Sequence, residues 1–414
     1  MTERSWLPAP VGIDSSQWIT RLDCRVILVV AHTIVSWRRV ADVAEYVEDD
    51  SRIQVVFTVA PDAFNNGVED QLDKAGALVL PWQQAIRERF DLAIAAAYGG
   101  LREIHSPIMV MAHGAGRGKI FRADHSAHRD RPAPTVYGLD AERLIHDGRL
   151  LPAALLLSHE REREVLARQC PAALAVAMVV GDPCFDRLVA SASRREDYRR
   201  DLGVEDGQPL VLVSSTWGPT GLFGRSPELL PALLRPSAQG SGPVRVAALL
   251  HPAVWSAHGR RQVRAWLRES RAAGLILLEP DDDWRAAVVA SDFVIGDHGS
   301  VPAYAAAIGR PVLRPSTWTN PLIPAHGAQG IVMAAAGRLA IDRPLLPQLR
   351  RASAIDPAAV AAALTSRPGQ AEALIRRELY RLIGLPQPTS ATRAGPTPVA
   401  GPLTGQLAGR TVAP

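Results

Sequence analysis

Residues 291–313, SDFVIGDHGSVPAYAAAIGRPVL, decide the fold of this chain. Residues 293–295 are a short apolar run of the kind found in a parallel sheet that is buried on both faces. The turn after this run is glycine-rich, which lets the backbone approach a ligand closely. Ser300 is in position to cap the helix that follows, and Pro302 suits the first turn of that helix. The stretch therefore predicts a strand, a tight turn, a helix, a second turn and a second strand.

The predicted helix start is a candidate anion site. A helix that begins at the carboxyl end of a strand directs unpaired N–H groups and its dipole toward the same point. We interpret the turn as a pocket for the pyrophosphate of a nucleotide-activated donor, formed by Asp297, His298, Gly299 and Ser300. In this interpretation the Asp297 and His298 side chains contact ribose or phosphate. The alternative is an ordinary strand-to-helix turn in which the serine only caps the helix.

The alternation of short apolar runs and helical stretches extends over most of the chain. The runs lie at residues 25–30, 53–59, 77–80, 92–97, 108–112 and 154–157, and then at 178–180, 210–213, 244–250, 275–278, 293–295 and 311–313. This alternation predicts parallel, doubly wound sheets. Because the pattern restarts near residue 178, we expect an α/β fold with two Rossmann-like domains that face each other across a cleft.

The length of 414 residues fits two domains of ordinary size. We expect a lead-in over residues 1–22, an N-terminal α/β domain over 23–189 and a C-terminal α/β domain over 190–384. The C-terminal domain would begin with a charged hinge region over 190–208 and end with an amphipathic helix over 370–383. Residues 385–414 are rich in Pro, Thr, Gly and Ala and predict a disordered tail.

The composition is that of a globular protein, with 47% hydrophobic residues and a formal net charge of +4. The basic residues are spread along the chain and are matched by acidic ones, so we predict no nucleic-acid surface. The three cysteines show no CxxC spacing, which argues against a zinc site or a disulfide framework. The first residues lack the form of a signal peptide, and residues 26–35, the longest apolar stretch, are too short to span a bilayer. We therefore expect a cytoplasmic protein whose membrane contact, if present, is peripheral.

Ligands of doubly wound sheets bind beyond the carboxyl ends of the strands. Four polar turns fall there in the predicted fold: His32 with Thr33, and residues 113–119, 214–218 and 296–300. Their convergence on one cleft carries more weight than any single motif.

The 113–119 loop, HGAGRGK, is glycine-rich and ends in Lys119. It is not a Walker A loop, because Ile120 stands where a magnesium-binding Ser or Thr is needed. His113 opens the loop at the end of a buried strand, and a histidine with a near-neutral pKa can take a proton from an attacking hydroxyl. The alternative for His113 is a structural imidazole that is bonded to the backbone.

The C-terminal half offers further polar candidates at strand ends. His251 follows an apolar strand and is either a phosphate ligand or proton-transfer group, or a cap of the next turn. Thr216 and its neighbouring serines could bind phosphate or cap a helix, and Trp217 lies beside them. Residues 281–283 are three consecutive aspartates, which we interpret as helix-capping residues rather than metal ligands. We predict no bound metal and no cofactor.

Taken together, these turns resemble those of the CDP-glycerol glycerophosphotransferase family, the teichoic acid polymerase-like group, which has a GT-B fold. The resemblance covers roughly residues 20–370. The matching positions are His113-Gly114 with Lys119, Leu250-His251-Pro252, Ser215-Thr216-Trp217, and Asp297-His298-Gly299-Ser300. Two positions depart from the family: Gly299 stands where it usually has the first of two serines, and Ala115-Gly116 stand where it tends to have Thr-Pro.

The resemblance implies a mechanism in which the N-terminal domain binds the acceptor and the C-terminal domain binds CDP-glycerol or a related donor. The implied donor-site residues are Thr216, Trp217, His251, Asp297, His298, Gly299 and Ser300. His113 would remove the proton of an acceptor hydroxyl, either lipid-linked or soluble, as that hydroxyl attacks the β-phosphorus. Lys119, His251 and the helix start at Ser300 would stabilise the phosphoryl charge while CMP leaves.

Two other classes of protein share these sequence features. One is a GT-B glycosyltransferase or a sugar 2-epimerase that uses a UDP-sugar, in which the chemistry takes place on the sugar. The other is a non-catalytic descendant that binds a nucleotide or a protein partner. The leaving group distinguishes the two transferases, because CMP release indicates phosphotransfer and UDP release indicates sugar transfer.

Overall fold

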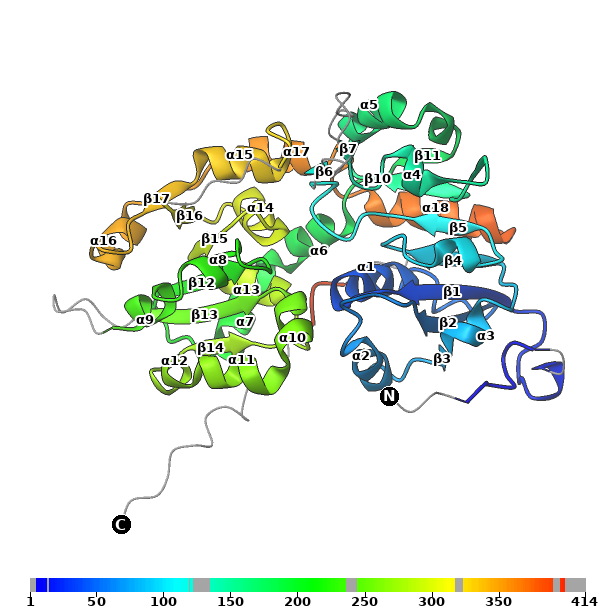
Figure 1. Ribbon diagram of the computed structural model, residues 1–414, viewed down its shortest axis with the longest axis horizontal. Helices are drawn as coiled ribbons and strands as arrows, with labels where there is room; N and C mark the ends of the chain where they lie inside the picture. Colours follow the sequence, from blue (N-terminus) through cyan, green and yellow to red (C-terminus); the bar gives the residue numbers. More distant parts are fainter. Residues whose placement is uncertain are drawn as a thin grey trace, which may run out of the picture. The chain divides into compact units, whose positions relative to one another are not determined.

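The computed structural model describes residues 5–12, 15–118, 120–121, 135–235, 244–316, 323–389 and 395–398. The chain divides into two compact units (Figure 1). Unit 1 comprises residues 1–186 and 364–394, and unit 2 comprises residues 187–363 and 395–414. The division between Asp186 and Arg187 lies close to the boundary that we expect between residues 189 and 190.

Unit 1 is built on a seven-stranded parallel sheet with the strand order β11-β10-β5-β4-β1-β2-β3 (Figure 1). The strands are β1 (Arg25–Ala31), β2 (Ile53–Val59), β3 (Val79–Leu80), β4 (Leu92–Ala95), β5 (Ile108–Val110), β10 (Ala154–Leu157) and β11 (Ala177–Val179). Two short antiparallel pairs, β6 (Ile120–Phe121) with β7 (Thr135–Val136) and β8 (Ile145–His146) with β9 (Arg149–Leu150), are additions that the apolar runs do not predict.

Helices cover both faces of this sheet, as the continuous apolar character of β1 requires. Ile27 and Val29 belong to one core cluster, and Leu28 and Val30 belong to the other. This division follows from the alternation of side chains along a strand. The first cluster includes residues of α1 (Ile34–Ala44), α2 (Val68–Lys74) and α18 (Ala371–Ile383), and the second includes residues of α3 (Trp82–Ala85), α4 (Ala141–Leu144), α5 (Glu160–Gln169) and the 3₁₀ helix η3 (Pro171–Val176).

The placement of α18 corrects the expected domain boundaries. Residues 370–383 were expected to complete the C-terminal domain, but α18 packs on unit 1 through the buried Ile375 and Leu379. The Tyr380 hydroxyl donates to Asp50 Oδ2 at 2.8 Å, and Arg376 Nε donates to the Tyr46 carbonyl at 3.1 Å. An amphipathic pattern shows that one face of a helix is buried, but it does not show which sheet covers that face.

Unit 2 contains a six-stranded parallel sheet with the order β14-β13-β12-β15-β16-β17. Its strands are β12 (Leu210–Ser215), β13 (Arg245–Leu250), β14 (Ile276–Leu278), β15 (Phe293–Gly296), β16 (Val312–Pro315) and β17 (Gly337–Leu339). All except β17 were predicted from the apolar runs. The two doubly wound sheets are therefore confirmed.

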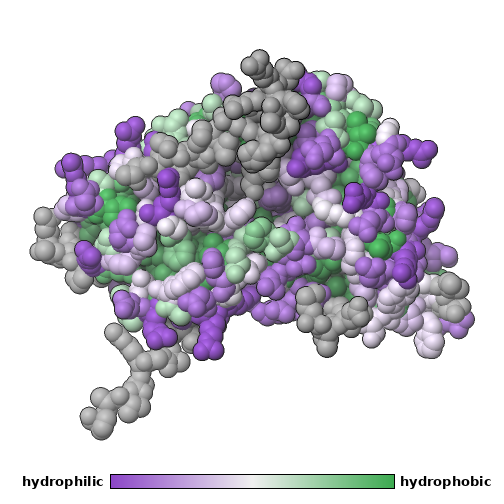
Figure 2. Space-filling view, viewed as in Figure 1, coloured by the Kyte–Doolittle hydropathy of each residue, from purple (hydrophilic) through white to green (hydrophobic). Residues whose placement is uncertain are grey.

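The helices of unit 2 follow or precede these strands in a regular alternation. They are α7 (Arg195–Asp201), α8 (Leu222–Arg225), α9 (Leu229–Leu234), α10 (Pro252–His258), α11 (Arg260–Trp266), α12 (Arg268–Ala272), α13 (Trp284–Ala290), α14 (Ser300–Ala307), α15 (Ala328–Ala335), α16 (Leu345–Arg350) and α17 (Pro357–Leu364), while α6 (Pro183–Ser191) carries the chain from unit 1 into unit 2. Hydrophilic side chains gather on the outer surface of α11 and α12, which are rich in arginine (Figure 2).

The expected hinge region contains a well-anchored helix. Arg195 and Arg199 of α7 pair with the two carboxylate oxygens of Asp292, at 2.5 and 3.0 Å. Arg199 also donates to the Ala290 carbonyl at the end of α13. These contacts join α7 to the sheet of unit 2, so this part of residues 190–208 is a fixed element of that unit.

The C-terminal region contains one segment with a defined position. Thr397 is fully buried, its N–H donates to Ser191 Oγ at 2.9 Å, and its carbonyl accepts from the Tyr198 hydroxyl at 2.6 Å. Residues 390–394 and 399–414, most of the tail that we expect to be disordered, lie outside the described residues. None of the described helices combines the length and the apolar character that a membrane span requires.

Candidate functional site

Each sheet has a point at which the strand order reverses. In unit 1 the chain adds β2 to one side of β1 and β4 to the other, and in unit 2 it adds β13 to one side of β12 and β15 to the other. The connecting helices leave in opposite directions at these points and open a crevice at the carboxyl ends of the two strands. The expected binding regions are therefore the ends of β1 and β4 in unit 1, and the ends of β12 and β15 in unit 2.

Two imidazoles hold the loop that follows β4 in unit 1. His32, directly after β1, contacts the Gly99 carbonyl through Nε2 at 2.7 Å, and His113, after β5, contacts the Ala96 carbonyl through Nδ1 at 2.9 Å. Because a carbonyl oxygen only accepts, the contacting nitrogen carries the proton in each ring. The neutral His113 ring therefore has its lone pair on Nε2, which is the form that a general base needs.

His32 differs from His113 in its burial. Its exposed fraction is 0%, and burial lowers its pKa below the ordinary value of 6.5, although the Gly99 carbonyl and Asp62 oppose this shift. A neutral, buried imidazole cannot reach a ligand. His32 thus supports the loop at the crevice, whereas His113 is only partly buried.

The glycine-rich loop after β5 is fixed by a carboxylate from α5. Glu162 accepts the Arg117 N–H through Oε1 at 2.8 Å and the Ser158 N–H through Oε2 at 2.7 Å. Gly116 has a φ of +62°, and a Cβ at this position would lie 3.1 Å from Glu162 Oε1. The loop therefore needs glycine at this position both for its backbone angle and for its close approach to the carboxylate.

The loop carries two cations, Arg117 and Lys119, of which the structure describes only Arg117. The Arg117 side chain turns into unit 1, where Nη1 donates to the Tyr98 hydroxyl at 3.2 Å and Nη2 to the Leu156 carbonyl at 3.4 Å. Burial raises the pKa of Tyr98, so this hydroxyl stays protonated and donates to the Gly138 carbonyl at 2.8 Å. Lys119, the predicted cation, lies outside the described residues.

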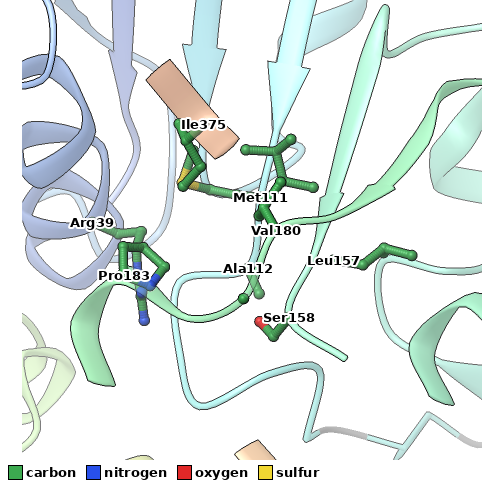
Figure 3. A pocket seen from close by; sticks show the side chains of 10 residues that line it. Arg39, Met111, Ala112, Leu157, Ser158, Val180, Pro183 and Ile375 are labelled. Atoms are coloured by element: carbon green, nitrogen blue, oxygen red, sulfur yellow. The ribbon is translucent and has the colours of Figure 1, made fainter. Parts of the chain in front are cut away.

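A small pocket lies beside this loop, at the carboxyl ends of β5, β10 and β11 (Figure 3). Its walls are mainly apolar and come from Met111, Leu156, Leu157, Val180, Pro183 and Ile375, with Arg39 and Ser158 as polar members. It has room for about one water molecule. The pocket is too small to hold a nucleotide or a sugar in this conformation.

Asp297 organises the corresponding crevice of unit 2. Its Oδ2 accepts the Thr216 N–H at 2.8 Å, the Thr216 hydroxyl at 2.8 Å and the Leu222 N–H at 2.9 Å, and its Oδ1 accepts the Gly299 N–H at 3.3 Å. Asp297 is 1% exposed. In this structure the carboxylate joins the loop after β12 to the turn after β15, and its contact with ribose or phosphate stays a prediction.

The turn between β15 and α14 has the predicted shape but a different cap. The N-cap residue of α14 is Gly299, not Ser300, and Gly299 supplies no side-chain hydrogen bond to the first turn. A Cβ on Gly296 would lie 2.5 Å from Pro302 Cγ, and a Cβ on Gly299 would lie 3.1 Å from Thr216 Cγ2. The backbone is thus packed tightly against the start of α14, whose first N–H groups face the carboxyl end of the sheet.

The other predicted site residues of unit 2 are Thr216 and Trp217 after β12, His251 after β13 and His298 in this turn. His251 caps α10, because its Nδ1 accepts the Ala253 N–H at 3.1 Å, which supports the structural alternative for one ring nitrogen. Trp217 is 43% exposed and His298 is half-buried. Thr216 contributes its hydroxyl to Asp297, so its role in this structure is to hold the loop.

Of the three aspartates at residues 281–283, Asp283 caps the following helix as the interpretation predicts. Asp283 caps α13 by accepting the Arg285 N–H at 2.9 Å, and Asp281 pairs with Arg260. Among the residues that the structure describes, no group of three or more His, Cys, Asp or Glu side chains is arranged to hold a metal ion.

Comparisons by sequence and by structure give different results. No protein-family model matches the chain, and none of the curated proteins matches it by sequence. The wall teichoic acid polymerase TagF matches in structure with a TM-score of 0.58 and 13% identity, over 87% of this chain and 89% of that chain. A TagF variant soaked with CDPG gives a TM-score of 0.56 with 14% identity, over 87% of this chain and 88% of that chain. The chain has a GT-B fold.

The fold also resembles that of a solved structure whose name gives a different activity from that of TagF. The UDP-GlcNAc 2-epimerase from Methanocaldococcus jannaschii matches with a TM-score of 0.51 and 12% identity, over 86% of this chain and 99% of that chain. At these identities the matches establish the fold, and the reaction has to be argued from the residues of this chain.

Three residues of the site were not identified from the sequence. Arg39 and Glu162 lie within the helices α1 and α5, where a charged residue usually faces solvent, and Gly99 lies in a loop without a motif. A weak signal was present for Glu162, because it stands five residues after the end of β10, within the first turn of α5, from which it can reach back to the strand end.

Proposed function

We propose that this protein is a GT-B transferase that moves a group from a nucleotide-activated donor to a hydroxyl acceptor. The proposal rests on one feature in each unit. In unit 1, the Ala96 carbonyl accepts a hydrogen bond from His113 Nδ1, and in unit 2, α14 begins directly after the turn that follows β15. In this proposal unit 1 is the acceptor side and unit 2 is the donor side.

The donor that we propose is CDP-glycerol or a related CDP-alditol. Its pyrophosphate would be bound at the start of α14, beside Gly299 and Ser300, with His251 as a further phosphate ligand and Trp217 and His298 beside the nucleoside. The fold of TagF, one variant of which was soaked with CDPG, supports this choice. Thr216 and Asp297 take the role of positioning residues, because their polar groups bond each other.

The proposed reaction is a displacement at phosphorus. His113 Nε2 accepts the proton of the acceptor hydroxyl, the hydroxyl oxygen forms a bond to the β-phosphorus, and the bond from that phosphorus to the bridging oxygen of CMP breaks. Lys119 and the start of α14 stabilise the charge of the phosphoryl group and of the leaving CMP. We place the reaction in the cytoplasm at the inner face of the membrane, with a polymer or lipid-linked hydroxyl as acceptor.

The second candidate is a reaction of a UDP-sugar, either glycosyl transfer or 2-epimerisation. The fold shared with the UDP-GlcNAc 2-epimerase favours it. The same start of α14 would bind the diphosphate of the UDP-sugar, and the reacting atom would be a carbon of the sugar.

Phosphorus NMR of the purified protein with CDP-glycerol or UDP-GlcNAc, with glycerol phosphate as an acceptor, tests both candidates. We expect CMP release from CDP-glycerol, and we expect His113→Gln to lower that rate about 10²- to 10⁴-fold, the usual range for loss of a general base. His105→Gln, an exposed histidine of the same unit, is the control and should keep the wild-type rate. UDP release, or conversion of UDP-GlcNAc into its 2-epimer, would support the second candidate, and nucleotide binding without turnover would contradict both.

A further inference from the structure

One buried guanidinium connects two segments of unit 1 that are far apart in the sequence. Arg39 lies on α1, and its side chain is 5% exposed. Its Nη1 donates to Asp182 Oδ1 at 2.9 Å, and its Nη2 donates to the Gly114 carbonyl at 3.2 Å. Gly114 follows His113 directly, so one end of this bridge lies in the loop of the proposed base. Figure 3 shows the Arg39 side chain among those that line the small pocket.

The other end of the bridge is the start of α6. The same Asp182 oxygen accepts the N–H groups of Cys184 at 2.9 Å and Phe185 at 3.2 Å, and Asp182 is fully buried. The chain passes from unit 1 into unit 2 within α6. Asp182 therefore fixes the first turn of the helix that leaves unit 1 and, at the same time, the guanidinium that holds the Gly114 carbonyl.

The chemistry of arginine makes this bridge rigid. A guanidinium is planar, and its two terminal nitrogens keep a fixed separation, so the Gly114 carbonyl is held at a set place relative to Asp182. A lysine at this position has one ammonium on a shorter stem. It can keep the pairing with Asp182, but it has no second nitrogen at the distance of the Gly114 carbonyl.

We propose that Arg39 is a positioning residue that holds the His113 loop in register with the start of α6. The catalytic consequence of this proposal rests on the proposed function, whereas the mechanical link between the two segments does not. Arg39 does not touch the reacting atoms. It acts through Gly114 on the direction of the His113 imidazole.

Hydrogen exchange measured by mass spectrometry tests the link in the full chain, without a substrate. In Arg39→Gln we expect exchange to rise about threefold or more in two places, residues 113–118 and residues 183–186. In Arg39→Lys we expect the rise only in residues 113–118, because the ion pair with Asp182 is kept. Arg376→Gln is the matched control: Arg376 is also buried in unit 1 and bonds a backbone carbonyl, that of Tyr46, but it is not bonded to the loop.

Unchanged exchange of residues 113–118 in Arg39→Gln, or an equal rise in Arg376→Gln, would overturn the proposal. If the wild type transfers a group from CDP-glycerol, a second measurement applies: kcat of Arg39→Lys should fall about tenfold with an unchanged KM for the donor, because the proposed donor residues belong to unit 2. A wild type without transfer activity would end the proposed function and leave the exchange result as it stands.

Discussion

Asp297 joins two loops of unit 2 through four hydrogen bonds to Thr216, Leu222 and Gly299. The turn after β15 was expected to carry the site, and its glycines do pack as a close backbone approach requires. The role of Asp297 could not be read from the turn, because its partners, Thr216 and the Leu222 N–H, lie about 80 residues earlier in the chain. Hydrogen bonds between segments that are distant in sequence depend on the strand order, which short motifs do not contain.

Asp297→Asn should therefore destabilise unit 2 rather than only weaken donor binding. The amide has one acceptor oxygen, while the carboxylate accepts four hydrogen bonds, and hydrogen bonds to charged groups contribute about 1.5–3 kcal/mol. We expect a loss of about 2–3 kcal/mol in urea unfolding of the ligand-free protein. Asp281→Asn, at a partly exposed ion pair, should cost less than about 1 kcal/mol. Equal losses in the two variants would contradict this role of Asp297.

The burial of His32 makes the stability of unit 1 depend on pH. Burial lowers its folded-state pKa below the unfolded value of 6.5, so the unfolded chain binds the proton more readily. The stability contributed by the neutral ring is complete above pH 6.5 and is lost as the pH falls from 6.5 toward the folded-state pKa. We expect the melting temperature of wild type to fall more steeply below pH 6.5 than that of His32→Asn. Parallel curves for the two proteins would show that His32 does not cause the slope.

At the scale of elements, most of the strands could be predicted from the sequence. The strands of both sheets, except β17, follow from apolar runs, which local composition determines directly. The strands of the short antiparallel pairs have only two residues each, and β17 has the sequence Gly-Arg-Leu, so none of them forms an apolar run. The cap of α14 was assigned to Ser300 because serine is a good cap, yet the chain enters the helix at Gly299.

The contact between β15 and α14 predicts a pair of compensating substitutions. Gly296→Ala places a Cβ 2.5 Å from Pro302 Cγ, so α14 must shift, and overpacking of this kind costs about 1–3 kcal/mol. Pro302→Ala removes the atom that the new Cβ meets. We expect the double variant to recover much of the stability lost in Gly296→Ala, measured by urea unfolding. A double variant that is no more stable than Gly296→Ala would show that the contact is not the cause.

At the scale of the whole molecule, each unit has its own sheet and its own core. The sequence predicted this division from the restart of the strand pattern. It could not predict that α18 returns to unit 1, because its apolar face fits any sheet with an uncovered apolar surface. The proposed division of labour, with the donor on unit 2, gives a prediction at this scale.

A nucleotide of the donor class should protect unit 2 alone in the first binding step. With CMP at about 100 times its Kd, binding stabilises the folded unit by about 2.7 kcal/mol. We expect hydrogen exchange to slow in residues 214–222 and 296–302 and to remain unchanged in β1 and β4. UMP at the same concentration is the control for the base. Protection confined to unit 1 would contradict the assignment of the donor to unit 2.

The return of α18 to unit 1 has a consequence for synthesis on the ribosome. Residues 371–383 emerge after every strand and helix of unit 2, although they cover the apolar face formed by Val43, Val47 and other residues near the start of the chain. During translation that face lacks its cover until residue 383 has left the ribosome, and an exposed apolar surface of this kind invites aggregation. The nascent protein should therefore depend on chaperones until α18 is made.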